Sequence, residues 1–445
     1  MRENIAEQLA LVAQPIDDQH ARELQRMGRV LDVLPEAARR VGADLTAGVA
    51  EPTMGREGMT GEQVLRAMVI KQMTGLSYSQ LAFHLADSTT YRTFCRFGIA
   101  GSTPKRSTLQ ENIKRVKAST WEAVNRLVLA KASREKVEDG RTVRIDSTVI
   151  DSHIHHPNDS SLLYDSVREL VRLMKRAREW VSVSWSDHRR VAKRRCFAIS
   201  NAKSMNARIP LYRELLQHTS RTVGYATAVC RALRCGNSER RRHLADRLGS
   251  VICLGNRVID QAQRRVLGGE SVPALEKVVS IFEPHTDVIV KGGRETLYGH
   301  KVFVSVGRSG MVLDLVVEKG NPPDLTRVTP MLTRHREHYG NVPEQASFDA
   351  GFTSKATLEQ ARALGVRDAA FARKSGLDVL AVVRSSKVYK QLLRFRAGIE
   401  GIISFLKRCF GLDRCTWRGE ESFSAYAHSA VLSANLLLLS RRTPR

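Results

Sequence analysis

Three carboxylates stand in sequence patterns that are suited to binding metal ions. Asp146 lies in the alternating stretch Arg141-Thr-Val-Arg-Ile-Asp-Ser-Thr-Val-Ile-Asp151, which predicts a strand. Asp349 ends a second, short strand pattern 203 residues later, and Glu400 follows after another 51 residues in a helical pattern. Carboxylates that leave different elements at one edge of a sheet suit Mg²⁺, a hard ion that prefers oxygen ligands. The sequence therefore predicts that Asp146, Asp349 and Glu400 hold two Mg²⁺ ions, with Mn²⁺ as an alternative.

A pair of such ions would support chemistry on a phosphodiester. Two ions about 4 Å apart can activate an attacking water or 3′-hydroxyl and stabilise the leaving oxygen. Without cations, three clustered carboxylates would repel one another and raise each other's pKa. Asp151, five residues after Asp146, competes as the first ligand. Asp146 is preferred because it lies inside the continuous strand pattern.

The helix expected around Glu400 carries two cations on the same side. We expect this helix to run from about Val383 to Phe410. Arg396 lies four residues before Glu400 and Lys407 seven residues after it, so a continuous helix places all three on one face. Basic side chains on either side of a metal-binding glutamate can hold the phosphates of the strand being cut. An ordinary surface face of ion pairs has the same spacing and is the alternative.

The composition is that of a globular protein with an unusual charge. The chain has 445 residues, enough for two or three domains, with 42% hydrophobic and 26% charged residues. Its 71 Lys and Arg residues outnumber its 46 Asp and Glu residues, which gives a net charge of +25. This excess predicts an anionic partner, first of all nucleic acid, because phosphate contacts dominate such binding. A generally solvated basic surface is the alternative.

Cysteine usage and hydropathy predict a cytoplasmic protein with no membrane partner. The seven cysteines form no Cys-x-x-Cys pair, which is typical of reduced, structural cysteines. The first residues are acidic and lack the apolar core of a signal peptide. The most apolar run, Ala430 to Leu439, is too short to span a bilayer.

The first third of the chain is predicted to be helical. Residues 1–55 form a helical lead in this interpretation, and residues 56–137 form a domain of short helices. Two capping boxes, Thr60-Gly-Glu-Gln63 and Ser77-Tyr-Ser-Gln80, mark helix starts on either side of Gly75. Short helices around a glycine turn predict a helix-turn-helix that binds DNA. A small helical bundle without a DNA-reading role fits the same pattern.

Residues 138–445 are predicted to form a mixed α/β domain, interrupted by a helical insertion at about 153–290. Four basic residues of the insertion fall on one helix face and are candidates for binding DNA: Arg168, Arg172, Lys175 and Arg176. A second basic group follows: Arg189, Arg190, Lys193, Arg194 and Arg195. The alternative is a solvated helix bundle with no DNA contact.

Several short motifs accompany the carboxylates and the N-terminal helices. They are Tyr91-Arg-Thr-Phe-Cys-Arg-Phe97, Asp146-Ser-Thr148, Gly299-His-Lys301, the loop Gly320-Asn-Pro-Pro-Asp324, Phe348-Asp-Ala-Gly351 and Arg396-x-x-x-Glu400-x6-Lys407. In these motifs the chain resembles bacterial insertion-sequence transposases of the DD(E) class, over most of its length. Two departures stand out. The family's last motif has a tyrosine where this chain has Leu393, with Tyr389 one turn earlier, and the insertion is longer than in many relatives.

The resemblance implies an RNase H-like catalytic fold and a DNA transposase. Such an enzyme binds terminal inverted repeats of double-stranded DNA, cuts them in a Mg²⁺-dependent reaction and transfers the strand to a target by its 3′-hydroxyl. It implies Asp146, Asp349 and Glu400 as the catalytic, metal-binding residues, Arg396 and Lys407 as residues that orient DNA, and a homodimer in the synaptic complex at the nucleoid. Two other interpretations stay open: a catalytically inactive or domesticated DNA-binding protein, and a DNA nuclease with the same fold.

Overall fold

The computed structural model describes residues 18–48, 58–98, 101–291, 295–372, 376 and 379–442. The chain divides into two compact units. Unit 1 comprises residues 1–150, 301–318 and 322–445, and unit 2 comprises residues 151–300 and 319–321. The expected helical lead, residues 1–55, lies only partly within the described residues, and the N-terminal segment examined for a signal peptide lies outside them.

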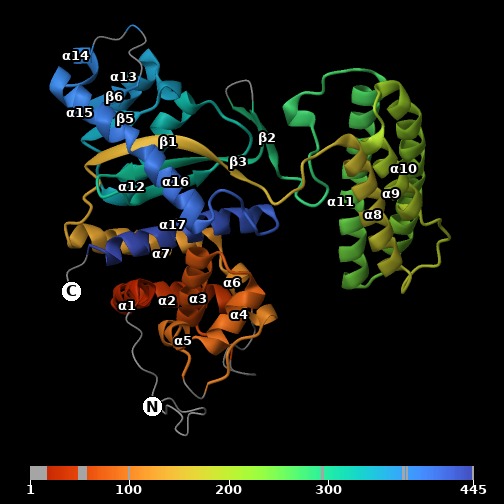
Figure 1. Ribbon diagram of the computed structural model, residues 1–445, viewed down its shortest axis with the longest axis horizontal. Coiled ribbons are helices and arrows are strands. Elements are labelled where there is room, and N and C mark those ends of the chain that lie inside the picture. The colour runs from red at the N-terminus through yellow and green to blue at the C-terminus, as the bar shows by residue number, and fades with distance from the viewer. Residues whose placement is uncertain are drawn as a thin grey trace, which may run out of the picture. The chain divides into compact units, whose positions relative to one another are not determined.

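A mixed sheet forms the centre of unit 1 (Figure 1). Its strands are β1 (Thr142–Asp151), β3 (Glu295–Gly307), β4 (Val312–Val317), β5 (Gln345–Phe348) and β6 (Asp368–Phe371). The order is β4-β3-β1-β5-β6, with β1, β5 and β6 parallel and β3 and β4 joined as an antiparallel hairpin. The α/β class expected from the sequence is therefore present, and β1 and β5 lie where the patterns around Asp146 and before Asp349 predicted strands.

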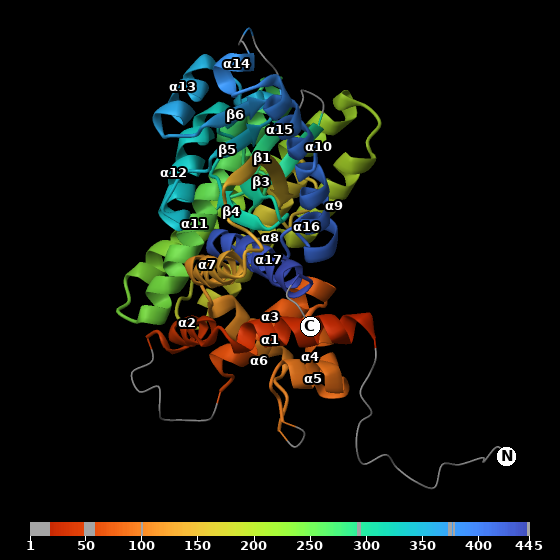
Figure 2. The ribbon, with the colours of Figure 1, turned by 90° about the vertical axis from the view of Figure 1, so that its left-hand side faces the viewer.

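Helices cover both faces of this sheet. The helices α12 (Val328–Tyr339) and α13 (Lys355–Ala363) lie on one side. The helices α15 (Ser386–Ala397) and α16 (Ile399–Phe410) lie on the other, as Figure 2 shows. Three short helical segments connect these elements: η3 (Asp324–Arg327), η4 (Ala350–Phe352) and α14 (Val379–Val382). The sheet is thus buried between two helical layers, as β5 and β6 require because their residues are almost all apolar or buried.

The N-terminal helices follow the capping signals in the sequence. They are α1 (Gln19–Asp32), α2 (Pro35–Thr46), α3 (Gly61–Thr74), α4 (Tyr78–Asp87), α5 (Thr89–Phe94), α6 (Arg106–Arg115) and α7 (Ala118–Arg134). Both predicted capping boxes form with reciprocal hydrogen bonds, Thr60 with Gln63 and Ser77 with Gln80. Gly75 ends α3 with a positive φ of 67°, a conformation that glycine adopts without strain.

The helix α17 (Glu420–Ser440) joins the N-terminal helices to the sheet. It packs against α7, α3 and α1 and also against β4 and α16. Among the described helices it alone is long and apolar enough to cross a membrane, but 78% of its most apolar window is buried inside the structure. We therefore interpret α17 as a core helix. The buried side chains of the N-terminal helices and of the sheet belong to one continuous apolar cluster around it.

The expected continuous helix from Val383 to Phe410 is wrong, because the chain breaks at Gly398 into α15 and α16. The cause is Arg144 of β1, which is buried. Its Nη1 donates a hydrogen bond of 2.7 Å to the carbonyl of Phe395, an acceptor that the next helical turn would otherwise use. A side chain on Gly398 would collide with the same guanidinium. The face shared by Arg396 and Glu400 is therefore not that of one straight helix.

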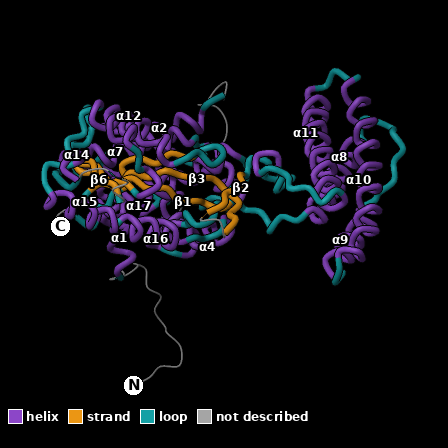
Figure 3. Tube along the Cα trace, turned by 90° about the horizontal axis from the view of Figure 1, so that it is seen from above, coloured by secondary structure: helices purple, strands orange, loops and turns teal. Residues whose placement is uncertain are grey.

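Unit 2 contains an antiparallel helix bundle, visible in Figures 1 and 3. Its long helices are α8 (Asp159–Ala177), α9 (Arg189–Asn201), α10 (Met205–Arg234) and α11 (Glu239–Ala262), followed by η1 (Gln263–Leu267) and η2 (Ala274–Glu276). They enclose a separate apolar core. The predicted helical insertion is therefore a packed structure of its own. The last residues of that prediction are wrong: Asp287–Lys291 form the strand β2, which pairs with the first half of β3.

One buried polar contact ties α17 to the sheet and provides a test of this packing. The side-chain amide of Asn435 accepts a 2.8 Å hydrogen bond from Val312 N and donates bonds of 2.7 Å to Val312 O and 2.8 Å to Asn125 Oδ1. Asn435→Ala should lower the free energy of unfolding by about 2–4 kcal/mol, because it leaves three buried polar groups without partners. Urea denaturation measures this loss. The exposed Asn341→Ala in the same unit should change it by less than about 0.5 kcal/mol, and equal effects would contradict the role of Asn435.

Candidate active site

Asp146 and Asp349 are brought together by the pairing of β1 with β5. The two strands are parallel, and their register pairs Thr142 with Gln345 and Ile145 with Phe348. This offset of 203 positions also separates Asp146 from Asp349, so the aspartates are the next pair in the same register. Asp349 follows the last residue of β5 and Asp146 lies inside β1. Two carboxylates far apart in sequence therefore meet where the pairing of these strands ends.

Arg396 lies between the two carboxylates. Its Nη1 is 3.1 Å from Asp349 Oδ1 and 3.9 Å from Asp146 Oδ2. The side chains of Arg396 and Asp146 are 17% and 16% exposed, whereas that of Asp349 is 43% exposed. The site thus has one mostly buried and one open carboxylate. Of the predicted residues, Asp146, Asp349 and Arg396 are in contact in the structure.

The pKa of Asp146 is raised to about 6 from an ordinary value of 3.8, mainly by burial. The neighbouring carboxylates of Asp349 and Asp324 also act to raise this pKa, whereas Arg396 and a 2.7 Å hydrogen bond from Ser147 N to Asp146 Oδ1 act to lower it. A partly buried carboxylate with two anionic neighbours favours either a proton or a cation. This is the electrostatic environment of a site for a divalent ion.

Asp324 is a neighbour of this site that the sequence analysis did not identify. Its Oδ1 is 2.7 Å from Nζ of Lys301 on β3, and the same ammonium donates a 2.8 Å hydrogen bond to Pro322 O. Lys301 therefore holds the loop before η3 beside the strands. The motifs that contain Lys301 and Asp324 were visible in the sequence, but nothing in their spacing indicated that the two residues pair.

The contacts of α15 and α16 indicate the level of Glu400 along β1. The chain at Phe395 lies over Arg144, while Ile403 and Leu406 line a small hollow together with Thr148 and Ile150. The first turn of α16 therefore passes β1 between Arg144 and Thr148, which is the level of Asp146. Glu400 lies in this turn and its side chain is exposed. No described residue makes an ion pair or hydrogen bond with it.

The remaining predicted residues are placed as follows. Lys407 lines the hollow beside Thr148 and forms a 3.6 Å ion pair with Asp413. Tyr389 is buried and donates its hydroxyl to Phe371 O at 2.8 Å, so it has a structural contact and does not replace the tyrosine missing at position 393. Asp151 lies five residues beyond Asp146, or about 16 Å along an extended strand. This separation is too large for the two to share an ion.

Three of the four basic residues expected to bind DNA in the insertion are paired within unit 2. Arg168 lies 3.0 Å from Asp165, Arg172 lies 2.5 Å from Glu169 and Lys175 lies 3.2 Å from Asp187. Arg176 is exposed. The α8 face is therefore partly neutralised by carboxylates of the same helix and of the following loop.

A second acidic group lies elsewhere in unit 1. Among the described residues, only Glu122, Asp314 and His338 have potential metal-ligand atoms that all lie within 4.8 Å of one another. Arg334, however, is 2.7 Å from both carboxylates. Burial also lowers the pKa of His338, which favours its neutral form. Because arginine already neutralises the acids, we interpret this group as a structural network.

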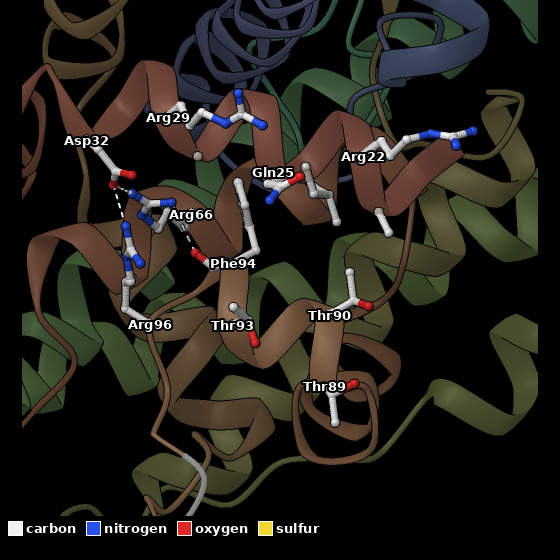
Figure 4. Close-up of a pocket in the computed structure, with 13 residues that line it drawn as sticks. Arg22, Gln25, Arg29, Asp32, Arg66, Thr89, Thr90, Thr93, Phe94 and Arg96 are labelled. Carbon is white, nitrogen blue, oxygen red and sulfur yellow. Dashed lines mark hydrogen bonds and ion pairs between the residues drawn. The ribbon is translucent and has the colours of Figure 1, made fainter. Parts of the chain in front are cut away.

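A separate hollow lies between α1 and α5, away from the carboxylates, with a volume of about 520 Å³ (Figure 4). Its floor includes the buried Arg66, which bonds Asp32 at 2.6 Å and Phe94 O at 3.2 Å. Arg22 and Arg29 line its upper rim in Figure 4, opposite Thr89, Thr90 and Thr93. This hollow is lined mainly by cations and hydroxyl groups, and Asp32, the carboxylate at its edge, is paired with Arg66 and Arg96.

Comparison with known families identifies the class of protein. Residues 286–436 match the model described as "Transposase DDE domain", and residues 13–115 match that described as "Transposase domain (DUF772)". Searches of curated proteins and of solved structures gave no match. Both matches are to transposases. Together they identify the chain as an insertion-sequence transposase of the DDE class.

The first match supports some residues of the site more than others. It spans Asp349, Arg396 and Glu400 but begins after Asp146, so the assignment of Asp146 depends on the strand register. The DDE family implies an enzyme of the nucleotidyl-transferase type that uses divalent metal ions. The acidic environment around Asp146, with its raised pKa, fits such an ion.

The raised pKa of Asp146 predicts how this residue affects stability. The folded protein holds the Asp146 proton more tightly than the unfolded chain, so the favourable contribution is complete below about pH 4 and is lost as the pH rises through 6. In metal-free buffer at pH 7.5, Asp146→Asn should therefore be more stable than the wild type by up to about 3 kcal/mol. Urea denaturation at pH 4 and at pH 7.5 measures the difference.

The gain in free energy of unfolding of Asp146→Asn over the wild type should shrink at pH 4. The control variant Asp151→Asn should show no such gain. A variant that is less stable than the wild type at pH 7.5 would show that Asp146 is not a strained carboxylate.

Proposed function

We propose that this transposase binds the terminal inverted repeats of its element and cuts and joins DNA there in a Mg²⁺-dependent reaction. The observation that carries the proposal is the register of β1 and β5, in which Asp146 and Asp349 directly follow the pair Ile145–Phe348 and lie beside Arg396. The parallel strands β1, β5 and β6 next to the hairpin β3-β4 also support an RNase H-like catalytic fold.

In this proposal the three carboxylates form the metal site. Asp146 and Asp349 hold the ions from the sheet and Glu400 holds them from the first turn of α16. Two Mg²⁺ ions bound there would activate the attacking oxygen and stabilise the leaving oxygen, with Mn²⁺ as a substitute. Arg396, which lies between the aspartates, orients the scissile phosphate. Lys407, two turns further along α16, contacts the same strand of DNA.

DNA binding is assigned to the N-terminal helices and to the insertion. The helices α3 to α5 would act as the helix-turn-helix-like region, and Arg22 and Arg29 on the rim of the α1–α5 hollow would contact phosphates. Arg176 of α8 is exposed and available to do the same. The double-stranded partners are the element ends and the target. Joining two ends requires two active sites, so we propose a homodimer in the synaptic complex, acting at the nucleoid in the cytoplasm.

The proposal predicts that the carboxylates are needed for catalysis but not for binding. Asp146→Asn, Asp349→Asn and Glu400→Gln should each lower Mg²⁺-dependent cleavage by roughly 100- to 1,000-fold or more, because each loses a ligand of the ions that stabilise the transition state. DNA carrying the element ends is the substrate, and gel analysis measures both nicked and joined products. Binding of the same DNA should be retained.

Asp151→Asn is the matched control, since it changes an aspartate of the same strand outside the site and should leave cleavage near the wild-type rate. If Asp151→Asn is inactive and Asp146→Asn is not, the first ligand is misassigned. Cutting without joining would show a nuclease, and binding without any nicking by the wild type would show an inactive DNA-binding protein.

A further inference from the structure

The two faces of α9 differ sharply in chemistry. The side that packs against α8 and α10 includes the buried Ala192 and Ile199. The opposite side is exposed over the length of the helix. Its residues recur at helical spacing: Arg190, Lys193, Arg194, Phe197, Ser200 and Asn201. This set is called the α9 outer face below.

The cations of the α9 outer face are not neutralised by the protein. The helix contains five basic residues and no acidic residue. Two of the five have partners: Arg189 lies 2.7 Å from Asp187, and Arg195 lies 2.6 Å from Glu214. Within the described residues, Arg190, Lys193 and Arg194 form no ion pair. The α9 outer face therefore differs from the α8 face, where carboxylates pair with most of the cations.

An exposed aromatic ring lies within this cationic face. The side chain of Phe197 is 72% exposed, one of the most exposed large apolar side chains in the described structure. It lies one turn after Lys193 and Arg194 on the same side of the helix. Exposing an aromatic ring to water is unfavourable in free energy, and a partner that covers the ring removes this unfavourable term. The partner must therefore be anionic and must also offer a flat apolar surface.

Nucleic acid with unpaired bases meets both requirements. Its phosphates neutralise the cations, and a base that is not stacked in a duplex can stack on the ring. In a duplex, each base face is already stacked on its neighbours. A duplex therefore offers phosphates to the cations but no free base face to Phe197. An anionic membrane is less suitable, since a helix that binds membranes needs a broad apolar face and here Ser200 and Asn201 follow the single aromatic residue.

We propose that the α9 outer face binds single-stranded DNA, with Arg190, Lys193 and Arg194 on its phosphates and Phe197 stacked on an unpaired base. The inference rests on the proposed function only in taking DNA as the partner. A duplex frays at a newly cut end, so the proposed cleavage would itself produce such strands. The site lies within one helix and needs neither the carboxylates nor a metal ion.

Binding of fluorescently labelled oligonucleotides to the full chain, in EDTA, tests the proposal. The probes are a short single strand of mixed sequence and the duplex of the same sequence. Phe197→Ala should weaken binding of the single strand by about 5- to 100-fold, the effect of losing one stacked base, and leave duplex binding nearly unchanged. Phe197→Trp should restore single-strand binding.

Salt dependence tests the three cations. Replacing Arg190, Lys193 and Arg194 by alanine together should lower the slope of log affinity against log salt by about 2 for the single strand. The matched control replaces Arg231, Arg234 and Arg240, which are exposed and likewise form no ion pair within the described residues. This control variant removes the same number of charges, from the ends of α10 and α11. It should lower the salt slope of single-strand binding by less than the α9 variant does.

Three results would overturn the inference. They are single-strand binding that is unaffected by Phe197→Ala, equal effects of the two triple variants, and tighter binding of anionic lipid vesicles through the same residues. Because every substituted side chain is exposed, circular dichroism should show an unchanged fold. If the chain binds single strands through α9 but never cuts element ends, the inference stands and the proposed function fails.

Discussion

The parallel pairing of β1 with β5 is the constraint on which the candidate active site depends. A shift of one residue would turn one aspartate to the other face of the sheet, and a shift of two would separate the pair by about 7 Å. One side-chain contact joins the two strands directly: Thr142 of β1 donates to Gln345 Oε1 of β5 at 3.3 Å. The strand β5 is in turn held on β6, where Gln345 donates to Asp368 at 3.0 Å and the ring of Phe348 stacks on Phe371 with centroids 5.1 Å apart.

The charges around the aspartates show how an acidic site can exist in the protein without ions. Arg396 is shared between Asp146 and Asp349, and Lys301 neutralises Asp324. Arg396 approaches Asp349 more closely than Asp146, so the buried carboxylate is the less compensated of the two. A divalent ion would therefore gain most at Asp146 and would compete with Arg396 for Asp349.

Much of this arrangement could be predicted from local signals. The strand around Asp146, the short strand before Asp349 and both capping boxes follow from patterns of a few residues, and the structure contains them. The break at Gly398 could not be predicted in this way, because its cause is Arg144, which lies 254 residues earlier and inserts into the helix from a neighbouring strand. The sequence did contain one hint. Arg144 is a charged residue between Val143 and Ile145, in the part of β1 that is fully buried, so its guanidinium needs a buried partner.

Other features were hidden because they depend on partners distant in sequence. The strand β2 has no marked pattern of its own and is defined by pairing with β3. The difference between the basic residues of α8 and α9 is more local and was visible in the sequence. Asp165 and Glu169 each lie three residues before an arginine of α8 and pair with it, whereas α9 contains no acidic residue. The role of Glu400 is a proposal. Contacts on either side of its helical turn indicate the level of that turn along β1, but no described residue pairs with its carboxylate.

The position of α17 in the core has a consequence for synthesis of the protein. This helix comes after every element that it packs against, including α1, α3, α7 and β4. A ribosome releases domains in chain order, and most domains can begin to fold as they emerge. In this chain, the apolar surfaces of the N-terminal helices and of β4 stay uncovered until α17 has been synthesised. For the N-terminal helices, that is hundreds of residues later. Nascent chains of this transposase should therefore expose those surfaces to chaperones and proteases until α17 emerges, so that an interrupted translation product lacks the helix that closes the core.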